Sequence, residues 1–416
     1  MIDRWAMARL RMALEYERIA CVIGPRQCGK TTMVENVPIK GSDLVSLGLD
    51  ANLEAAKWDP RFFISRYKGK CLIIDEIQKA PFLIGEIKYT VDHDDRPGQF
   101  LLTGSSDYRR LPHATESLAG RVDIVRLRTF TTAERMGKKP RFLERLFEGD
   151  FSFSIDRATT GKEFALREAI NGGYPGALRR SGSEEAREAW FRNQVEQHVI
   201  TDMKEQWAIR REDLVRTLFP CLAAFSGKPF NVLGVSRKLG ANWKTLTNYV
   251  GAMRAMSIVD ELPAWTALGR DAPGKAPKLF MTDSGLMASI LGIRNAEKII
   301  GNPGRNATEQ VGKLVETWAY NQIVPEADLH PMWQMFHLRT RSHEIDFLVS
   351  GDCGDMLGIE VKASQSVNET DFRHLFWFGE QAHSGKFTGI VLYAGSEVLS
   401  FGNNCYAVPF ASLWSD

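Results

Sequence analysis

The sequence predicts an α/β protein with a parallel-sheet domain, a helical middle region and a second α/β domain. Two observations support this prediction. Short apolar, β-prone runs alternate with helical stretches up to about residue 130, and β-rich segments return after about residue 305. Strands that alternate with helices favour a mostly parallel sheet with helices on both faces. The chain has 416 residues, whereas one domain usually has about 100–200, so several domains are expected.

Residues 1–130 are expected to form the parallel-sheet domain. An amphipathic helix is predicted over residues 5–17. The apolar run Ile19–Ile23 predicts a buried strand that leads through a Gly/Pro turn into a helix over Lys30–Asn36, and another helix is predicted over Phe82–Val91. Four more strands are predicted, over Leu44–Leu47, Cys71–Ile74, Gln99–Thr103 and Val122–Leu127.

Three further regions are expected after this domain. Residues 131–215 are polar and helical, with a break at Gly172-Gly173-Tyr174-Pro175, and are predicted to form a lid or linker. Residues 216–304 are predicted to form a winged-helix-like domain, in which Asp271–Lys278, rich in Pro, Gly and Lys, is a loop or wing. Residues 305–416 are predicted to open with a helix over Glu309–Gln322 and to continue with strands over Met335–Leu338, Glu344–Val349, Leu357–Lys362 and Gly389–Tyr393.

Charge and composition narrow the classes of function. The net charge is only +2, so any nucleic-acid surface would have to be a local patch. Six cysteines lie apart without CxxC or metal-ligand spacing, which suits a reduced protein rather than a disulfide framework. The charged N-terminal segment is not a signal peptide, and no apolar run approaches the ~20 residues that span a bilayer. We expect a cytoplasmic protein with no membrane partner.

Residues 24–31 match the phosphate-binding pattern GxxxxGK[ST] in full, with a strand predicted before them and a helix after. Backbone N–H groups of such a loop surround phosphates, so glycine is needed for positive φ and close approach. We expect ATP with Mg²⁺ here: Lys30 would neutralise the β- and γ-phosphates, and the Thr31 hydroxyl would bind Mg²⁺. The residues expected to contact the nucleotide are Gly24, Pro25, Arg26, Gln27, Cys28, Gly29, Lys30, Thr31 and Thr32.

Two strand ends are expected to complete this site. One buried strand leads directly into Asp75 and Glu76. Asp75 would hold Mg²⁺ through water, and Glu76 would polarise the water that attacks the γ-phosphate. The strand that ends at Thr103 is expected to lie between these motifs, so Thr103 or Ser105 would sense the γ-phosphate, unless this is a plain strand-to-loop turn. Arg121 is either a finger that reaches a phosphate or a solvated surface arginine.

These motifs, taken in order, resemble those of one family. Gly-Pro-Arg-Gln-Cys-Gly-Lys-Thr-Thr, Ile-Asp-Glu-Ile-Gln-Lys-Ala-Pro, Leu-Thr-Gly-Ser-Ser and Glu-Ser-Leu-Ala-Gly-Arg look like the prokaryotic AAA+-type P-loop ATPases with a conserved C-terminal domain of unknown function. The resemblance continues through residues 172–175, 278–286 and 343–347 and covers nearly the whole chain. It implies an ATPase core, a winged-helix-like segment and a nuclease-like end domain. AAA+ proteins often form rings, which leaves a homo-oligomer open. Cys28 departs from the family, where we expect a small apolar residue, but cysteine fits sterically.

Acidic side chains in the last domain suggest a second site. Glu316 lies on the opening helix, Asp346 lies in a strand, and Glu360 and Lys362 share one face of the next strand. Carboxylates from adjacent strands can bind Mg²⁺ and a nearby lysine can orient water, which is the chemistry of metal-dependent phosphodiester hydrolysis. The set resembles the PD-(D/E)XK restriction-endonuclease-like fold, although Ile345 stands where that pattern has proline. The alternatives are a salt-bridged strand pair or an inherited fold that no longer cuts.

The middle segment leaves two interpretations open. Asn231–Leu239 and Asn242–Met253 are predicted to be helices joined by a turn at residues 240–242, and Ile258–Trp265 is predicted to be a β-wing. Such a second helix can read a DNA major groove, whereas the alternative is a structural lid or a protein-docking module. The side chains expected to face outward on it are Trp243, Lys244, Thr245, Thr247 and Asn248.

Three hypotheses about function follow. The first is an ATP-hydrolysing machine with DNA as its partner. The second is an ATPase switch whose C-terminal domain is non-catalytic and docks a protein partner. The third, an ATP-dependent kinase, is weaker because no acceptor-binding motif is visible in the sequence.

Overall fold

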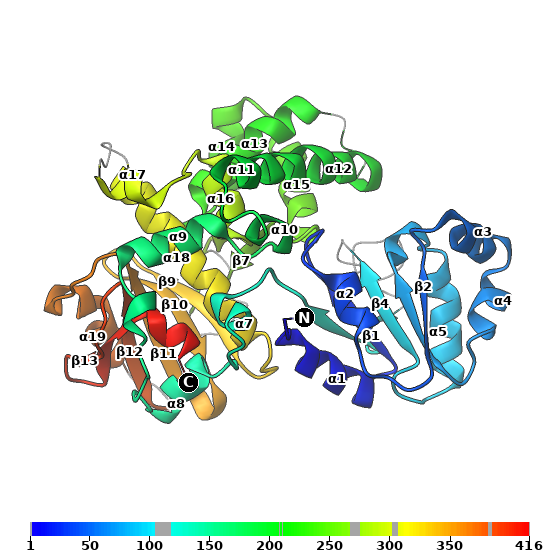
Figure 1. The fold of residues 1–416 in the computed structure, drawn as a ribbon, viewed down its shortest axis with the longest axis horizontal. Coiled ribbons are helices and arrows are strands. Elements are labelled where there is room, and N and C mark those ends of the chain that lie inside the picture. Colours follow the sequence, from blue (N-terminus) through cyan, green and yellow to red (C-terminus); the bar gives the residue numbers. More distant parts are fainter. Residues whose placement is uncertain are drawn as a thin grey trace. The chain divides into compact units, whose positions relative to one another are not determined.

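The computed structural model describes residues 2–104, 118–207, 209, 211–266, 275–301, 307–381 and 385–415. The chain forms two compact units (Figure 1). The first contains Asp3–Arg128 and Met253–Ile258, and the second contains Thr129–Ala252 and Val259–Asp416. The predicted division into domains at residues 1–130, 131–215, 216–304 and 305–416 stays a prediction.

A five-stranded parallel sheet forms the centre of the first unit. All of its pairings are parallel, so the carboxyl ends of the five strands lie at one edge. Each predicted strand is confirmed to within two residues at either end. The strands are β1 (Ile19–Ile23), β2 (Ser42–Ser46), β3 (Cys71–Asp75), β4 (Phe100–Gly104) and β5 (Val122–Arg126), in the order β2-β3-β4-β1-β5.

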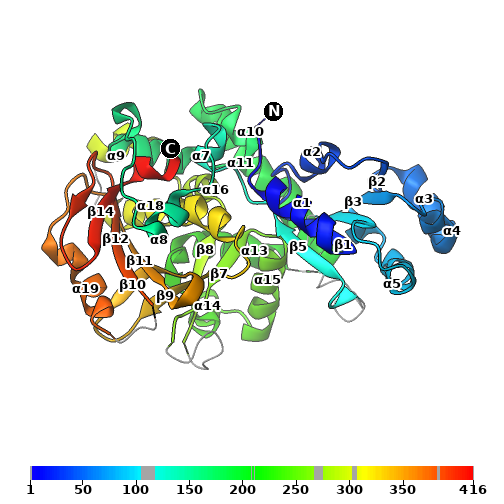
Figure 2. The same cartoon turned by 90° about the horizontal axis from the view of Figure 1, so that it is seen from below.

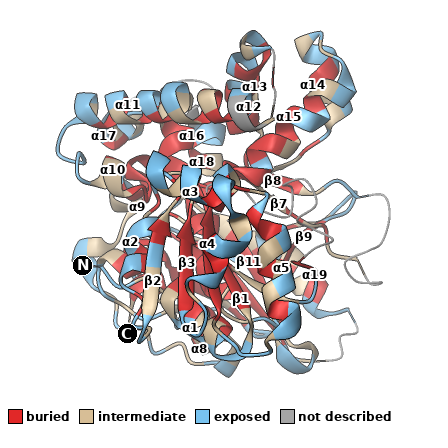
Figure 3. Cartoon of the chain, turned by 90° about the vertical axis from the view of Figure 1, so that its right-hand side faces the viewer, coloured by how far each residue is buried: buried red, intermediate tan, exposed pale blue. Residues whose placement is uncertain are grey.

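Helices cover both faces of this sheet, as the sequence predicts. In β1, Ile19, Cys21 and Ile23 enter one core while Ala20 and Val22 enter the other, because successive side chains of a strand point to opposite faces. Figure 2 shows α1 lying along β1 and β5, and Figure 3 shows that β1 and β3 are buried. The first core includes α3 (Asp50–Trp58), α4 (Pro60–Ser65) and α5 (Leu83–His93), and the second includes α1 (Ala6–Tyr16) and α2 (Lys30–Glu35).

A six-stranded mixed sheet forms one part of the second unit. Its first three strands are antiparallel neighbours, and the next two continue parallel to the third. Helix α18 (Ala307–Ala327) precedes these strands and packs on β11, and α19 (Arg373–Gly379) packs on β12. The strands are β9 (Gln334–Arg339), β10 (Glu344–Ser350), β11 (Met356–Lys362), β12 (Phe387–Tyr393), β14 (Cys405–Pro409) and the edge strand β13 (Leu399–Ser400), and the last two were not predicted.

A three-stranded sheet with three helices precedes α18 in the same unit. Strand β8 pairs antiparallel with both β6 and β7. The elements follow in the order α13 (Glu212–Phe225), β6 (Lys228–Pro229), α14 (Val232–Leu239), α15 (Trp243–Ala255), β7 (Val259–Leu262) and β8 (Lys278–Met281). Both predicted helices of this segment are confirmed.

The position of Lys278 in the structure differs from the predicted one. The sequence places it at the end of a loop or wing, but it begins β8 and is fully buried. The preceding Pro, Gly and Lys residues indicate a loop, and nothing local shows that this lysine has buried partners. Residues 271–274 of the predicted loop lie outside the described residues.

The second unit contains further helices and a close contact between two of its motifs. The Gly173 N–H donates to an Asp283 carboxylate oxygen at 2.7 Å, and the Leu286 N–H donates to the other at 2.8 Å, which caps α16. A Cβ on Gly173 would lie 2.2 Å from the Phe130 carbonyl oxygen, so only glycine fits. These helices are α7 (Thr132–Arg135), α8 (Phe142–Glu148), α9 (Lys162–Asn171), α10 (Pro175–Leu178), α11 (Glu184–Asn193), α12 (Ile200–Trp207), α16 (Ser284–Ile290) and α17 (Ala296–Gly301), with a π-helix at Gln194–Val199.

We expect Asp283→Ala to lower the free energy of unfolding by about 2–4 kcal/mol, because it removes a helix cap and leaves the Gly173 N–H without this acceptor. Ser183→Ala is the matched control, since Ser183 caps α11 from an exposed position and its loss should cost about 1 kcal/mol or less. Urea unfolding followed by circular dichroism measures both. Equal effects of the two changes would contradict a special role for the buried contact.

Candidate functional site

The loop between β1 and α2 lies at the carboxyl edge of the first sheet. Gly29 has φ +104°, a left-handed conformation that glycine adopts at little cost. A Cβ on Gly24 would lie only 2.1 Å from the Leu127 carbonyl oxygen, just beyond β5. Cys28 is buried, and its Sγ donates to the same oxygen at 3.5 Å. The loop thus passes against its neighbour with no space for a side chain at residue 24, and the unexpected cysteine fits.

Lys30 is directed into this loop from the first position of α2. The side chain is buried, and Nζ donates to the carbonyl oxygens of Gly24 and Pro25 at 2.9 Å each. An ammonium group held inside the loop would meet the phosphates of a nucleotide bound there. Gln27 and Thr32 are exposed on the loop and the helix that follows it.

Arg4 supports the loop, a role that no sequence pattern indicated. Its Nη1 donates to the Cys28 carbonyl oxygen at 3.0 Å, and its Nη2 donates to the Arg128 carbonyl oxygen at 2.6 Å. One guanidinium therefore joins the phosphate-binding loop to the chain that leaves β5. No motif surrounds Arg4, so only the long-range contacts reveal it.

Asp75 is the centre of a buried polar cluster. The Thr31 hydroxyl donates to Asp75 Oδ2 at 3.2 Å, and the Thr103 hydroxyl donates to Oδ1. Asp75 and Thr103 are only 4% and 0% exposed, so the bond between them is shielded from water, whereas Thr31 is exposed. The prediction that the strand of Thr103 lies between the other two motifs is confirmed, because β4 pairs with both β1 and β3.

Glu76 follows Asp75 in an uncommon backbone conformation. Its φ is +62° and its ψ is 43°, in the left-handed region that non-glycine residues rarely adopt. The Gln78 amide donates to Glu76 Oε2, and a short 3-10 helix, η1 (Ile77–Lys79), begins at the next residue. The turn places Glu76 directly beside Asp75 at the edge where the loop lies. Such conformations cluster at functional sites.

Arg121 lies at the other edge of the sheet. It precedes β5, whereas the phosphate-binding loop follows β1, and these two strands are parallel over five paired residues. A strand of this length separates the two edges by about 15 Å. Arg121 forms an ion pair with Asp92, near the end of α5. This position does not favour contact with a nucleotide in its own loop. Ser105, the other predicted sensor beside Thr103, lies outside the described residues.

The geometry of the loop fits a nucleotide with Mg²⁺. A buried lysine, a hydroxyl bonded to a carboxylate, and a loop without side-chain bulk at Gly24 and Gly29 are together at one edge. Thr31 and Asp75 supply the hard oxygen atoms that Mg²⁺ prefers. Separately, none of the helices in the described part of the chain has the length and apolarity needed to cross a bilayer.

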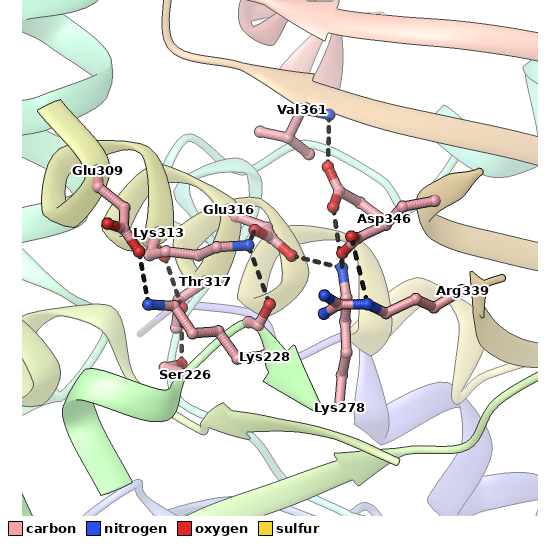
Figure 4. Close-up of polar contacts among 12 residues, drawn as sticks. Ser226, Lys228, Lys278, Glu309, Lys313, Glu316, Thr317, Arg339, Asp346 and Val361 are labelled. Carbon is pink, nitrogen blue, oxygen red and sulfur yellow. Dashed lines mark hydrogen bonds and ion pairs between the residues drawn. The ribbon is translucent and has the colours of Figure 1, made fainter. Parts of the chain in front are cut away.

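Two of the predicted acids of the second unit, Glu316 and Asp346, surround a lysine together with Glu344, which the sequence analysis did not single out (Figure 4). The Lys278 ammonium lies 3.0 Å from Glu316 Oε1, 3.2 Å from Glu344 Oε1 and 2.9 Å from Asp346 Oδ1. Burial alone would lower the pKa of Lys278, but the three carboxylates raise it well above its usual value. The lysine is therefore charged. Among the described residues, no group of three or more His, Cys, Asp or Glu side chains is arranged to hold a metal ion.

The other two predicted residues of this set are less closely joined to it. Burial, and then the charge of Asp346, raise the pKa of Glu360 well above its usual value, so the protonated form is favoured. Lys362 points to Asp371, with 3.5 Å between Nζ and Oδ1. Burial would raise the pKa of Asp346, but the Lys278 and Lys313 charges lower it below its usual range. Burial and Asp346 raise the pKa of Glu316 to about 6.

Comparison with protein families assigns the class of the first unit. Residues 16–136 match the model of an AAA domain, residues 165–297 match a domain of unknown function (DUF8612), and residues 311–413 match another (DUF4143). The chain therefore carries an AAA-type ATPase domain. Two curated relatives are the uncharacterised proteins Mb2031c of Mycobacterium bovis and Rv2008c of Mycobacterium tuberculosis. Each is 26% identical over 365 residues, which cover 87% of this chain and 74% of the relative.

Three solved structures show a weak likeness to this chain. A single-substitution variant of RuvB from Thermotoga maritima is 16% identical, with a TM-score of 0.27 over 62% of this chain and 89% of that chain. The STAND protein PH0952 of Pyrococcus horikoshii is 12% identical, with a TM-score of 0.29 over 76% and 48%. The Hsp104–ADP complex of S. cerevisiae is 14% identical, with a TM-score of 0.29 over 78% and 45%. Scores this low carry no argument, so the class rests on the domain match and the site geometry.

We expect Gly24→Ala to weaken nucleotide binding more than tenfold, because a methyl group 2.1 Å from the Leu127 carbonyl oxygen must displace the loop. Gly85→Ala is the matched control, since Gly85 is exposed on α5 and a Cβ there meets nothing within 4 Å. Titration with a fluorescent ATP analogue measures both. Unchanged affinity of Gly24→Ala would show that the close approach does not shape the site.

Proposed function

We propose that this chain hydrolyses ATP with Mg²⁺ at the carboxyl edge of the first sheet. The observation that carries the proposal is the cluster in which Thr31 and Thr103 both donate to Asp75, beside the buried Lys30. This cluster joins the phosphate-binding loop to two neighbouring strand ends. Mg²⁺ bound with ATP would offset the charge of the phosphates as the terminal one is transferred.

Each residue of the site has a role in this proposal. Lys30 would leave its carbonyl partners and pair with the β- and γ-phosphates, while Thr31 and Asp75 would bind Mg²⁺ directly and through water. Glu76 would accept a hydrogen bond from the attacking water and orient that water, as a general base does. Thr103 would hold Asp75 in place and report the γ-phosphate. Backbone N–H groups between Gly24 and Thr32 would surround the phosphates.

Glu76→Gln should bind ATP as tightly as the parent but turn it over at least a hundredfold more slowly, because an amide cannot accept a proton. Lys30→Ala should lose ATP binding while it keeps the fold. Glu54→Gln is the control, since Glu54 is exposed on α3 and pairs only with Lys57 among the contacts described. Phosphate release and nucleotide titration separate the two effects. Normal turnover in Lys30→Ala would refute the site assignment.

We further propose that Arg121, if it contacts nucleotide, does so in a neighbouring copy of the chain. Its place at the amino end of β5 supports this, since its own loop is at the opposite edge. An assembly of several copies would place the Arg121 of one beside the loop of the next. The pairing with Asp92 would then be exchanged for a phosphate.

The partner that we propose for the middle segment is DNA. Two features support this proposal. The first is the order of elements from α13 to β8, in which two helices joined by a turn precede an antiparallel pair of strands. The second is the exposed start of α15. A helix presented in this way can enter a major groove. Of the five predicted outward residues, Trp243, Lys244, Thr247 and Asn248 are exposed and Thr245 is half-buried.

DNA should stimulate ATP turnover, and binding should weaken steeply with salt because phosphate contacts release counterions. Lys244→Ala should weaken binding to all sequences and reduce the slope of log K against log salt by about 1, as loss of one phosphate contact does. Lys57→Ala, an exposed lysine on α3, is the charge-matched control. Turnover that is identical with and without DNA, together with no binding at low salt, would exclude DNA as the partner.

For residues 305–416 we propose a restriction-endonuclease-like fold. The order of elements supports it: α18, three antiparallel strands, α19 and then a strand parallel to β11. Glu316, Asp346 and Glu360 come from α18, β10 and β11 of that arrangement. The second hypothesis, in which this region is non-catalytic and docks a protein partner, is favoured by one observation. A buried lysine already pairs with two of those three acids.

A further inference from the structure

We infer that the Lys278 ammonium takes the place of a divalent cation among the acids of the second unit, so that this unit neither binds a catalytic metal there nor cleaves phosphodiesters. The inference goes beyond the proposed ATP hydrolysis and does not depend on it. It follows from which atoms the acids already contact and from what Lys278 is attached to.

Three carboxylates engage the Lys278 ammonium. Nζ donates to Glu316 Oε1 at 3.0 Å and to Asp346 Oδ1 at 2.9 Å, and it forms an ion pair with Glu344 Oε1 at 3.2 Å. The side chain is 0% exposed. Mg²⁺ needs oxygen atoms at about 2.0–2.1 Å, so it cannot occupy this space while the lysine remains. The lysine therefore supplies, from inside the chain, the positive charge that these acids need.

The remaining oxygens of the two central acids are also engaged. Glu316 Oε2 accepts from the Lys313 ammonium at 2.5 Å, and Lys313 also donates to the Gly227 carbonyl oxygen at 3.0 Å. Asp346 Oδ2 accepts the Val361 N–H at 3.1 Å. Neither carboxylate presents a pair of unoccupied oxygens to a common point. Figure 4 shows Lys278 between Glu316 and Asp346.

Lys362, the residue expected to orient water, forms its described ion pair outside the Lys278 cluster. Lys362 pairs with Asp371, with 3.5 Å between Nζ and Oδ1. Hydrolysis of a phosphodiester requires a nucleophilic water that is positioned and deprotonated. The described contacts thus provide neither the metal position nor the lysine that such chemistry would use.

The backbone attachment of Lys278 gives the cluster a different role. Lys278 begins β8, which pairs with β6 and β7 in the three-stranded sheet, whereas its partners belong to α18 and β10. Gly227, which precedes β6, approaches Glu316 so closely that a Cβ would lie 3.0 Å from Oε2. The ion cluster therefore fixes the three-stranded sheet to α18 and to β10 of the six-stranded sheet. A movement of one would be transmitted to the other.

The first test measures metal binding by the full chain without nucleotide, in a Lys30→Ala background that lacks nucleotide binding in the first unit. Millimolar Mn²⁺ is added, bound Mn²⁺ is read by electron paramagnetic resonance, and nicking of supercoiled DNA is assayed with Mg²⁺ and Mn²⁺. We expect neither Mn²⁺ binding nor nicking that depends on Asp346. Binding or nicking that is present here and lost on adding Asp346→Ala would overturn the inference, even if ATP turnover is as proposed.

The second test removes the internal cation. Lys278→Met should lower the Tm by roughly 5 °C or more, since it leaves buried acids without their partner. Mn²⁺ should then raise the Tm of that variant but not of its parent, and adding Asp346→Asn should restore part of the Tm and abolish the Mn²⁺ response. Lys228→Met is the control, because Lys228, in β6, forms only a more exposed ion pair with Glu309 among the described residues.

Each outcome of the second test decides the point. A Lys278→Met variant as stable as Lys228→Met would refute the role of the lysine as the internal cation. Equal Mn²⁺ stabilisation of the parent and of Lys278→Met would also refute it, because the parent would then already bind the metal. If Lys278→Met fails to fold, the Mn²⁺ and nicking measurements on the unchanged Lys278 chain still decide between a metal site and an internal ion pair.

Discussion

The Asp75 carboxylate is the interaction on which the first unit depends, because its two oxygens join two separate elements. One accepts from Thr31 at the start of α2, and the other accepts from Thr103 at the end of β4. This is geometrically possible only because β4 lies between β1 and β3 and all three run in the same direction. Sheet order, rather than any single residue, thus brings the candidate nucleotide site together from pieces far apart in the sequence.

The second unit uses buried charge in another way. Lys278 of β8 pairs with Glu316 of α18 and with Asp346 of β10, and these two pairs are shielded from water. Removing ions from water is costly, and a buried pair returns that energy only when its geometry and hydrogen bonding are good. Specific contacts of this kind make a junction that tolerates few other arrangements.

Local patterns were sufficient to predict much of the first unit. The apolar runs ending in Asp75 and Thr103 mark buried strands whose last residues are polar, and the glycine-rich turn before Lys30 marks the loop. Helix α3 escaped prediction because residues 50–58 are largely exposed and carry a weak apolar pattern.

What could not be predicted depends on contacts between distant residues. Lys278 pairs with Glu316, 38 positions away, and with Asp346, 68 positions away, and a Pro/Gly-rich stretch before it favours a loop. The acids were recognised from their spacing, yet no spacing rule shows that a lysine from another sheet occupies the point where they converge. Charge balance in a buried cluster belongs to the tertiary structure. The same is true of the distance between Arg121 and its own loop.

The contacts of Arg4 bear on where the ATPase domain begins. The matched domain covers residues 16–136, but Arg4 holds the Cys28 and Arg128 carbonyl oxygens from twelve positions before it. A fragment of residues 16–136 would keep every residue of the phosphate-binding motif. It would lose Arg4 and most of α1. Low activity in such a fragment would reflect the truncation rather than the chemistry of the intact protein.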